Sequence, residues 1–299
     1  MKRDFTIITY KTLLKALQQQ GFSFIPLAQY IEAKSHNSPH PAHLSSVTSH
    51  LSSHNSHPSS LTSHLSPPTS QNSPLIILRH DVDARPQNSL AFARIQSEMG
   101  IRGTYYFRMV PQSYNEAIIK EIVKLGHEVG YHYETMDTSK GNVDKAYEEF
   151  CRNLEKFRKL TPVQAISMHG SPMSPYDNRE IWKKYDYKNL GILAEPYFDI
   201  NFNELYYITD TGRRWDGHLY NVRDKATKEN PVTNLEFLKL RFHSTQDIIK
   251  AVETDHFPKQ AMLNFHPQRW TNRPLPWVKE FVWQNIKNQG KRMLLALRK

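Results

Sequence analysis

Short apolar runs alternate along most of the chain with longer segments in which apolar residues recur every three or four positions. Apolar runs of four to eight residues are typical of buried strands, and the longer periodic segments are typical of amphipathic helices. We predict strands at 75–83, 102–107, 127–133, 163–169 and 260–266, with weaker candidates at 190–194, 205–209 and 238–243. We predict helices from 10 to the stop at Gly21, and at 27–33, 86–99, 113–125, 143–160, 245–252 and 277–288.

This repeated order of strand and helix predicts an α/β fold with a parallel sheet. About seven such units in one domain favour a closed or nearly closed barrel. The barrel is expected to occupy residues 75–299, with the helical segment 1–33 packed against it.

Residues 34–74 differ sharply in composition from the rest of the chain. Serine, histidine, proline and asparagine dominate there, and no acidic residue occurs between Glu32 and Asp81. The five residues Thr-Ser-His-Leu-Ser at 48–52 recur at 62–66. Such a segment has too few large apolar residues to offset the entropy of ordering, so we predict a disordered insert. Its histidines are excluded from the expected site.

Composition and charge narrow the classes of function. The single cysteine, Cys151, excludes an internal disulfide and a cysteine-based metal site. The formal net charge is +10, but no compact basic run carries interleaved aromatics, so we expect a solvated basic surface and no nucleic-acid partner. No apolar run reaches about 18 residues and no signal-peptide pattern follows Met1, so we expect a cytoplasmic protein without membrane insertion. The oligomeric state is not indicated.

The strand at 75–83 ends in a cluster of charged residues. Side chains alternate along a strand, so Arg79, Asp81 and Asp83 share one face. Successive side chains on one face lie about 7 Å apart. Two buried carboxylates this close are costly unless a cation or a proton is nearby. The pattern therefore predicts a cation at this strand end.

Four other predicted strands also end in polar residues. His132 and Glu134 are two apart and can face the same way, whereas His127 is five residues before His132 and points to the opposite face. The remaining three ends carry His169, the stretch 210–216 and the stretch 264–270. Parallel α/β enzymes keep their sites at the carboxyl ends of strands, so we expect these groups to meet around a ligand.

Three motifs together resemble a known family. Arg-His-Asp-Val-Asp at 79–83, Gly-His-Glu-Val-Gly-Tyr-His at 126–132 and Asn-Phe-His-Pro at 264–267 are similar to the polysaccharide deacetylases, the NodB-homology group of carbohydrate esterase family four. The resemblance spans about 75–270. It implies a distorted (β/α)7-type barrel, a divalent metal, commonly zinc, and removal of an acetyl group from an N-acetylated sugar.

The resemblance also implies roles for individual residues. Asp81 matches the catalytic base and Asp83 the aspartate on the metal. His132 matches the first histidine of the family's His-x-x-x-His motif, and His266 the acid that protonates the leaving amine. The stretch from Asp210 to Trp215 is similar to a segment that shapes the substrate cleft, and we assign His169 and Trp270 to substrate binding as well.

Two departures from the family pattern affect this reading. Met136 stands where the family has its second metal histidine, and a thioether is a poor ligand for such a cation. Glu134 or Asp137 can substitute as oxygen ligands, and we prefer Glu134 because it shares a face with His132; His169 or water are the alternatives. The family also places an arginine where His169 stands, and we expect Arg79 to hold the base instead.

Two other functions are kept as alternatives. A glycosidase using Asp81 with Glu134 or Asp210 would explain the carboxylates but not the histidines at strand ends. A catalytically inert carbohydrate-binding member of the same fold would explain Met136. Metal content and acetate release separate these alternatives from the deacetylase.

Overall fold

A computed structural model of the chain describes residues 3–36, 73–170, 174–216 and 233–297. Most of the segment predicted to be a disordered insert, 34–74, lies outside these ranges. None of the helices in the described ranges is long and apolar enough to cross a membrane.

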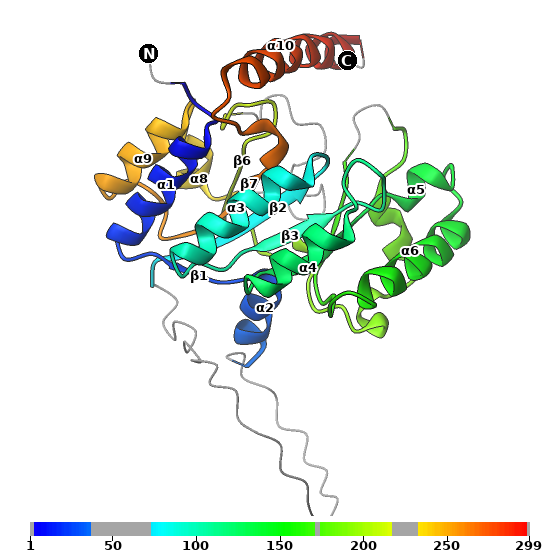
Figure 1. Cartoon of the computed structure of the whole chain (residues 1–299). Helices are drawn as coiled ribbons and strands as arrows, with labels where there is room; N and C mark the ends of the chain where they lie inside the picture. Colours follow the sequence, from blue (N-terminus) through cyan, green and yellow to red (C-terminus); the bar gives the residue numbers. More distant parts are fainter. Residues whose placement is uncertain (1–2, 37–72, 171–173, 217–232, 298–299) are drawn as a thin grey trace, which may run out of the picture.

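Seven parallel strands form a single sheet at the centre of the molecule (Figure 1). Six of them follow the order β5-β4-β3-β2-β7-β6, and β1 pairs with the beginning of β2. The strands are β1 (Ser23–Phe24), β2 (Leu75–Val82), β3 (Thr104–Phe107), β4 (Glu128–Tyr133), β5 (Ile166–Met168), β6 (Tyr206–Thr209) and β7 (Gln260–Phe265). Because the strands are all parallel, their carboxyl ends meet at one end of the sheet.

The α/β class and the distorted barrel of parallel strands are confirmed. Within the described ranges the end strands β5 and β6 do not pair with each other, so the barrel is open between them. One isolated parallel bridge, between Ala165 and Ala194, extends the β5 edge.

Helices lie between successive strands and cover the sheet (Figure 1). They are α1 (Ile7–Gln19), α2 (Leu27–His36), α3 (Pro86–Glu98), α4 (Glu116–Lys124), α5 (Thr135–Thr138), α6 (Val143–Arg158), α7 (Pro196–Asp199), α8 (Leu235–Lys239), α9 (Thr245–Glu253) and α10 (Pro274–Leu297). The described residues also include the short 3₁₀ helices η1 (Asn178–Lys183), η2 (Tyr187–Leu190) and η4 (Pro267–Arg269). Side chains such as Asn115, Asn142 and Ser244 cap helix N-termini by accepting backbone N–H groups.

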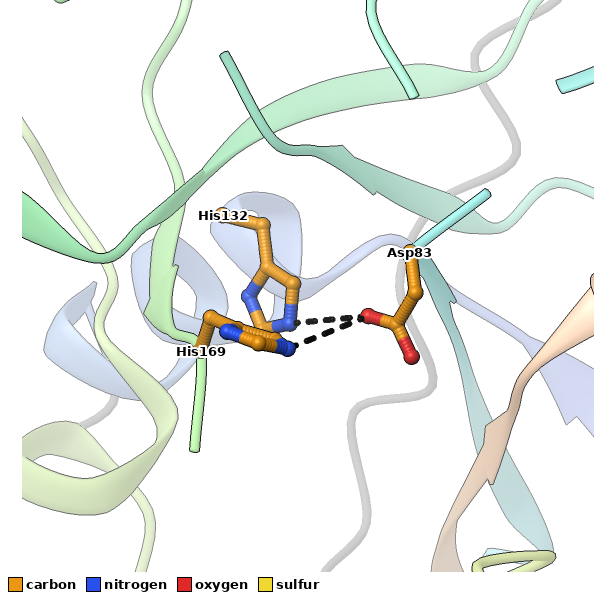
Figure 2. Close-up of side chains that lie close together, drawn as sticks. All are labelled: Asp83, His132 and His169. Carbon is orange, nitrogen blue, oxygen red and sulfur yellow. Dashed lines mark ion pairs between the residues drawn. The ribbon is translucent and has the colours of Figure 1, made fainter. Parts of the chain in front are cut away.

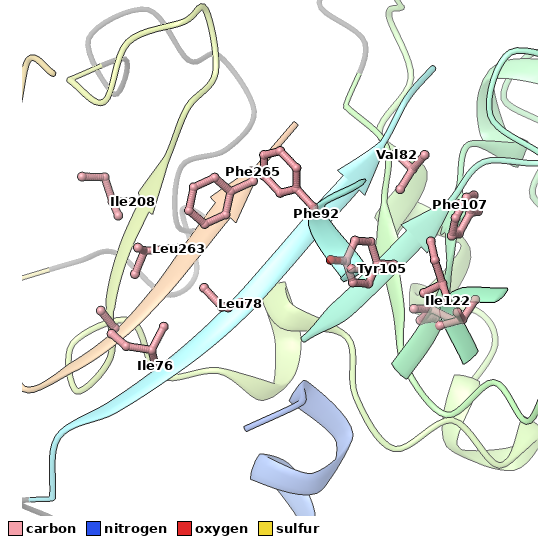
Figure 3. Packing of buried hydrophobic residues seen from close by; sticks show 14 of the residues in the cluster. Ile76, Leu78, Val82, Phe92, Tyr105, Phe107, Ile122, Ile208, Leu263 and Phe265 are labelled. Carbon is pink, nitrogen blue, oxygen red and sulfur yellow. The ribbon is translucent and has the colours of Figure 1, made fainter. Parts of the chain in front are cut away.

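The central strand β2 is buried along its whole length and separates two apolar clusters. Ile76, Leu78 and Val82 belong to the larger cluster, with Phe92 of α3 (Figure 3). Leu75 and Ile77 belong to the smaller one, with residues of β3 and β7. The expected period of two is therefore confirmed, and it leaves Arg79 and Asp81 on the inner face at the far end of the strand.

Some sequence predictions of secondary structure are wrong. The strand expected at 238–243 is absent: Asn234 caps the helix α8 by accepting from the backbone of Glu236 and Phe237, and the chain then continues without pairing. The strand expected at 190–194 is reduced to the bridge at Ala194, because η2 occupies its beginning. The last helix, expected at 277–288, extends over 274–297. The N-terminal segment also contributes β1 to the sheet, in addition to packing on it.

Candidate metal centre and active site

Six polar side chains converge where the parallel strands end. Five of them directly follow a strand: Asp83 follows β2, Arg108 follows β3, His169 follows β5, Asp210 follows β6 and His266 follows β7. The sixth, His132, lies near the end of β4. This placement follows from the parallel register, which sets β2 beside both β3 and β7 and β4 beside both β3 and β5. The structure therefore brings the polar strand ends together, as the sequence analysis expects of their positions.

Asp83, His132 and His169 form a group that can hold a metal ion. One ligand atom from each lies within 4.8 Å of the other two. The Oδ1 atom of Asp83 is 3.7 Å from Nε2 of His132 and 3.7 Å from Nε2 of His169 (Figure 2). Two imidazole nitrogens and one carboxylate oxygen are a donor set typical of zinc and other divalent transition metals.

Contacts behind each side chain orient this group. The Nδ1 atom of His132 is 2.9 Å from the carbonyl oxygen of Ser167, so Nδ1 carries the proton and Nε2 keeps its lone pair. The Oδ2 atom of Asp83 accepts a hydrogen bond of 2.9 Å from Gln268. Its Oδ1 atom is buried and has no hydrogen-bond partner among the described residues. A buried acceptor of this kind facing two imidazole lone pairs fits a bound cation.

The protonation states of His132 and Asp83 suit metal binding at neutral pH, whereas burial is outweighed at His169 by Glu134 and Asp83, which raise the pKa of that ring. Burial lowers the pKa of His132 to about 4, so its ring is neutral. Burial alone would raise the pKa of Asp83, but His266, His169 and His132 outweigh it and lower that pKa, so the carboxylate is ionised. Neutral imidazole and ionised carboxylate are the forms that coordinate metals.

The Asp81 carboxylate lies directly beside the metal ligands. Nε and Nη2 of Arg79 donate to its two oxygens at 2.8 and 2.9 Å, and Asn264 donates to Oδ2 at 2.9 Å. Oδ2 is also 3.9 Å from Nε2 of His132. Burial would raise the pKa of Asp81, yet the Arg79 charge holds it well below its usual value. The expected contact of Arg79 with Asp81 is thus present.

His266 approaches the same group from β7. Its Nε2 atom is 3.9 Å from Oδ2 of Asp83. On the other side of the ring, Nδ1 is 2.6 Å from Oδ1 of Asp210, which also accepts the backbone N–H of His266. Trp270 donates its indole N–H to Oδ2 of Asp210 at 2.5 Å. Asp210 therefore fixes the His266 ring with Nε2 directed at the site.

Five residues expected in the site are placed differently from the expectation. His169, assigned to substrate binding, lies in the group with Asp83 and His132. Trp215 and Trp270, assigned to substrate binding, are 3% and 0% exposed and pack in the core, where substrate does not reach them. Glu134, the preferred third ligand, contacts Arg108 and Nδ1 of His169 rather than Asp83. Asp210, assigned to substrate binding, is buried behind His266.

The remaining candidates are accounted for by their surroundings. Met136 is buried in the larger apolar cluster, and Asp137 faces Ser174 and Asn178. His127 is bonded to the carbonyl oxygen of Ala93, away from His132, as its position on the strand predicted. Sequence reasoning missed Arg108 and Gln268. Arg108 directly follows a predicted strand, so the rule that singled out the other strand ends would have found it.

Comparisons with known proteins give structural likeness without sequence matches. No model of a protein family matches the chain, and no curated protein matches it. The chain is similar to the crystal structure of BA3943, a CE4 family pseudoenzyme from Bacillus anthracis, at 12% identity and a TM-score of 0.40. The match covers 74% of this chain and 63% of that one, so the chain spans less than two thirds of that protein's length. It is also similar to the peptidoglycan deacetylase PdaC from Bacillus subtilis, at 12% identity and a TM-score of 0.36, over 75% of this chain and 98% of that one.

Proposed function

We propose that the protein is a metal-dependent carbohydrate deacetylase that removes an acetyl group from an N-acetylated sugar or polysaccharide precursor. The observation that carries this proposal is the triad of Asp83, His132 and His169 with Asp81 and His266 each within 3.9 Å of one of its members. The three motifs that resemble the polysaccharide deacetylases supply four of these five residues, all but His169.

The metal would be held by Nε2 of His132, Nε2 of His169 and the Asp83 carboxylate. The choice of His169 over Glu134 rests on the distances around Asp83. A divalent cation in such a site polarises a carbonyl oxygen and lowers the pKa of a bound water. The histidine-rich donor set favours zinc over magnesium or calcium.

Asp81 is the proposed general base. Its Oδ2 atom accepts two hydrogen bonds, whereas Oδ1 accepts one, from Arg79. The carboxylate thus accepts three hydrogen bonds in all, which leaves it a lone pair for the proton of the attacking water. Arg79 holds the carboxylate ionised and in one orientation, which the transfer of that proton requires.

His266 is the proposed general acid. With Nδ1 held by Asp210, the proton to be donated resides on Nε2, which faces Asp83. Protonated at Nε2, the ring gives this proton to the sugar nitrogen as the bond to the acetyl carbon breaks. Asp210 stabilises the charged ring, as a buried carboxylate does for a catalytic histidine.

An inert carbohydrate-binding protein of the same fold is the second candidate. The observation that favours it is the tight enclosure of Asp81, which is 4% exposed. We also propose that the protein is cytoplasmic and that its substrate is a precursor of a polysaccharide rather than the finished polymer.

The test is to measure bound metal and acetate release on the purified chain, with N-acetylated chitooligosaccharides as substrate. Asp83→Asn and His132→Ala are expected to lose metal and activity together. Asp81→Asn and His266→Ala are expected to keep metal and to lose acetate release. Stoichiometric metal with no acetate from any N-acetylated sugar tested would favour the inert protein, and reducing sugar without acetate would favour a glycosidase.

A further inference from the structure

We infer that Glu134 and Arg108 act as a positioning pair that fixes the His169 ring for metal binding, without touching the metal. This inference rests on the proposed metal-binding function of the triad. It replaces the expectation from sequence that Glu134 is itself a ligand. It assigns a function to two charged side chains that the proposed reaction does not otherwise use.

The first observation is the contact behind the His169 ring. The Oε2 atom of Glu134 is 3.0 Å from Nδ1 of His169, while Nε2 of the same ring is 3.7 Å from Oδ1 of Asp83. The two nitrogens lie on opposite sides of an imidazole, so the carboxylate is behind the ring and the metal position is in front of it. The contact is an ion pair by distance, and Nδ1 of His169 makes no aligned hydrogen bond among the described residues. A carboxylate in this place favours a proton on Nδ1 and leaves the Nε2 lone pair for the metal.

The second observation is that Arg108 donates hydrogen bonds to both oxygens of the Glu134 carboxylate. Its Nε and Nη2 atoms donate to Oε1 at 3.1 and 2.9 Å, and Nη2 is 2.6 Å from Oε2. A carboxylate held by a guanidinium on both oxygens is a poor candidate for direct coordination, because the bound cation would face the Arg108 charge.

The third observation is that the contacts run along neighbouring strand ends. Nη1 of Arg108 reaches the carbonyl oxygen of Asp83 at 3.4 Å. The sequence of contacts therefore passes from Asp83 after β2, through Arg108 after β3 and Glu134 after β4, to His169 after β5. This is the order of those strands in the sheet. The pair thereby helps to fix the spacing between Asp83 and His169, whose strands β2 and β5 have β3 and β4 between them in the sheet.

The two histidine ligands are held in different ways. His132 is fixed by a backbone carbonyl, that of Ser167, which no side-chain substitution removes. His169 is fixed by a side chain, Glu134. Partners of this kind typically contribute 10- to 100-fold to metal affinity. Glu134 should therefore affect the metal affinity of the site by its contact with His169, and not by a contact with His132.

The experiment is a zinc competition titration with a chromophoric chelator on the full chain, together with the visible absorption spectrum of the Co²⁺-loaded protein. Glu134→Gln and Arg108→Gln are the test variants. Glu155→Gln and Arg152→Gln, at exposed positions of α6, are the matched controls, and His169→Ala is the ligand-loss reference. Arg108→Lys is a milder variant, to be used if Arg108→Gln does not fold.

We expect about 10- to 100-fold weaker zinc binding for Glu134→Gln and Arg108→Gln, with the Co²⁺ bands at the wild-type wavelengths. The controls should bind zinc as the wild type does. Unchanged zinc affinity in both test variants would overturn the inference. Co²⁺ bands of Glu134→Gln that move away from the wild-type wavelengths in protein that is fully loaded with metal, while Arg108→Gln keeps the wild-type bands, would also overturn it, because Glu134 would then be a ligand. Failure of the wild-type chain itself to bind either metal would instead refute the proposed function.

Discussion

The guanidinium of Arg79 holds both carboxylate oxygens of Asp81, which lies two residues further along the same strand, at 2.8 and 2.9 Å. Both side chains are almost fully buried, and the Arg79 charge also faces the rings of Tyr106 and Tyr197 at 5.6 Å. The strand period of two makes this pair possible, because it sets the two residues next to each other on one face. The proposed base and its partner thus come from one strand.

Arg79→Lys tests whether the two-point contact with Asp81 matters. Lysine keeps the positive charge but replaces the planar, two-point donor by a single point charge. We expect acetate release to fall at least about 10-fold while zinc content stays stoichiometric, since Arg79 contacts none of the three proposed ligands. Metal analysis and acetate assays on the same preparation check this. A loss of zinc would show that Arg79 supports the metal centre rather than the base.

His169→Ala and Met136→Leu test which residue completes the metal centre. His169→Ala removes one of three proposed ligands and should abolish stoichiometric zinc binding at micromolar concentrations. Met136→Leu keeps the volume of a buried apolar side chain, so we expect zinc binding to be unchanged and stability to change by less than about 1.5 kcal/mol. Zinc titration and chemical denaturation measure the two effects. Zinc binding that survives in His169→Ala would point to another third ligand.

Asp210→Asn tests the support of the proposed acid. In the wild-type protein both His266 and Trp270 donate to the Asp210 carboxylate. An amide offers an oxygen to one donor and an N–H group to the other, so one contact becomes repulsive. We expect acetate release to fall by about 10²- to 10⁴-fold with zinc content retained. Wild-type turnover in this variant would show that the proposed acid does not need Asp210.

The positions of the strands and most strand-end residues could be predicted because they depend on local pattern. Buried apolar runs fix where strands lie, and a parallel sheet then brings their ends together. The period of two correctly set Arg79 beside Asp81. These features need no knowledge of how distant segments pack.

The third member of the triad could not be predicted by the same rule. Glu134 shares a face with His132 only if the strand continues, but β4 ends at Tyr133 and the backbone of Glu134, at φ −144° and ψ 28°, turns into α5. The side chain is thereby directed to Arg108 and the back of His169. Likewise, the burial of Trp215 and Trp270 depends on their packing against Phe5, which is distant from both in sequence.

Gly130→Ala tests the close packing of β4 below the site. A Cβ atom at Gly130 would lie 2.5 Å from the Tyr106 ring and 2.6 Å from the carbonyl oxygen of Ala165. The second contact is with backbone, so we expect a loss of about 3 kcal/mol or more in the free energy of unfolding. Gly290→Ala in α10 is the control, because nothing lies within 4 Å of its Cβ position. Denaturant titration compares the two, and equal stability of both variants would show that β4 can move.

His127→Gln tests how buried histidines make stability depend on pH. His127 is 5% exposed, its Nδ1 atom accepts from the backbone of Gly103, and its Nε2 atom therefore donates to the carbonyl oxygen of Ala93. Burial lowers its pKa from 6.5 to about 4. Between these two values the unfolded chain binds a proton that the folded chain does not, so stability falls as the pH is lowered through that window.

The expected size of this effect is up to about 3 kcal/mol, from a pKa shift of roughly 2.5 at 1.36 kcal/mol per unit. Glutamine can replace both hydrogen bonds but does not titrate, so His127→Gln should show a shallower loss of stability between pH 6.5 and 4 than the wild-type chain. Urea titrations across this range measure the slope.

His256→Gln, at an exposed position, is the control and should keep the wild-type slope. The buried His80 acts in the same direction, because burial lowers its pKa to about 3, so part of the slope should remain in both variants. If His127→Gln and the wild-type chain lose stability in parallel, His127 is already protonated in the folded protein or reaches water.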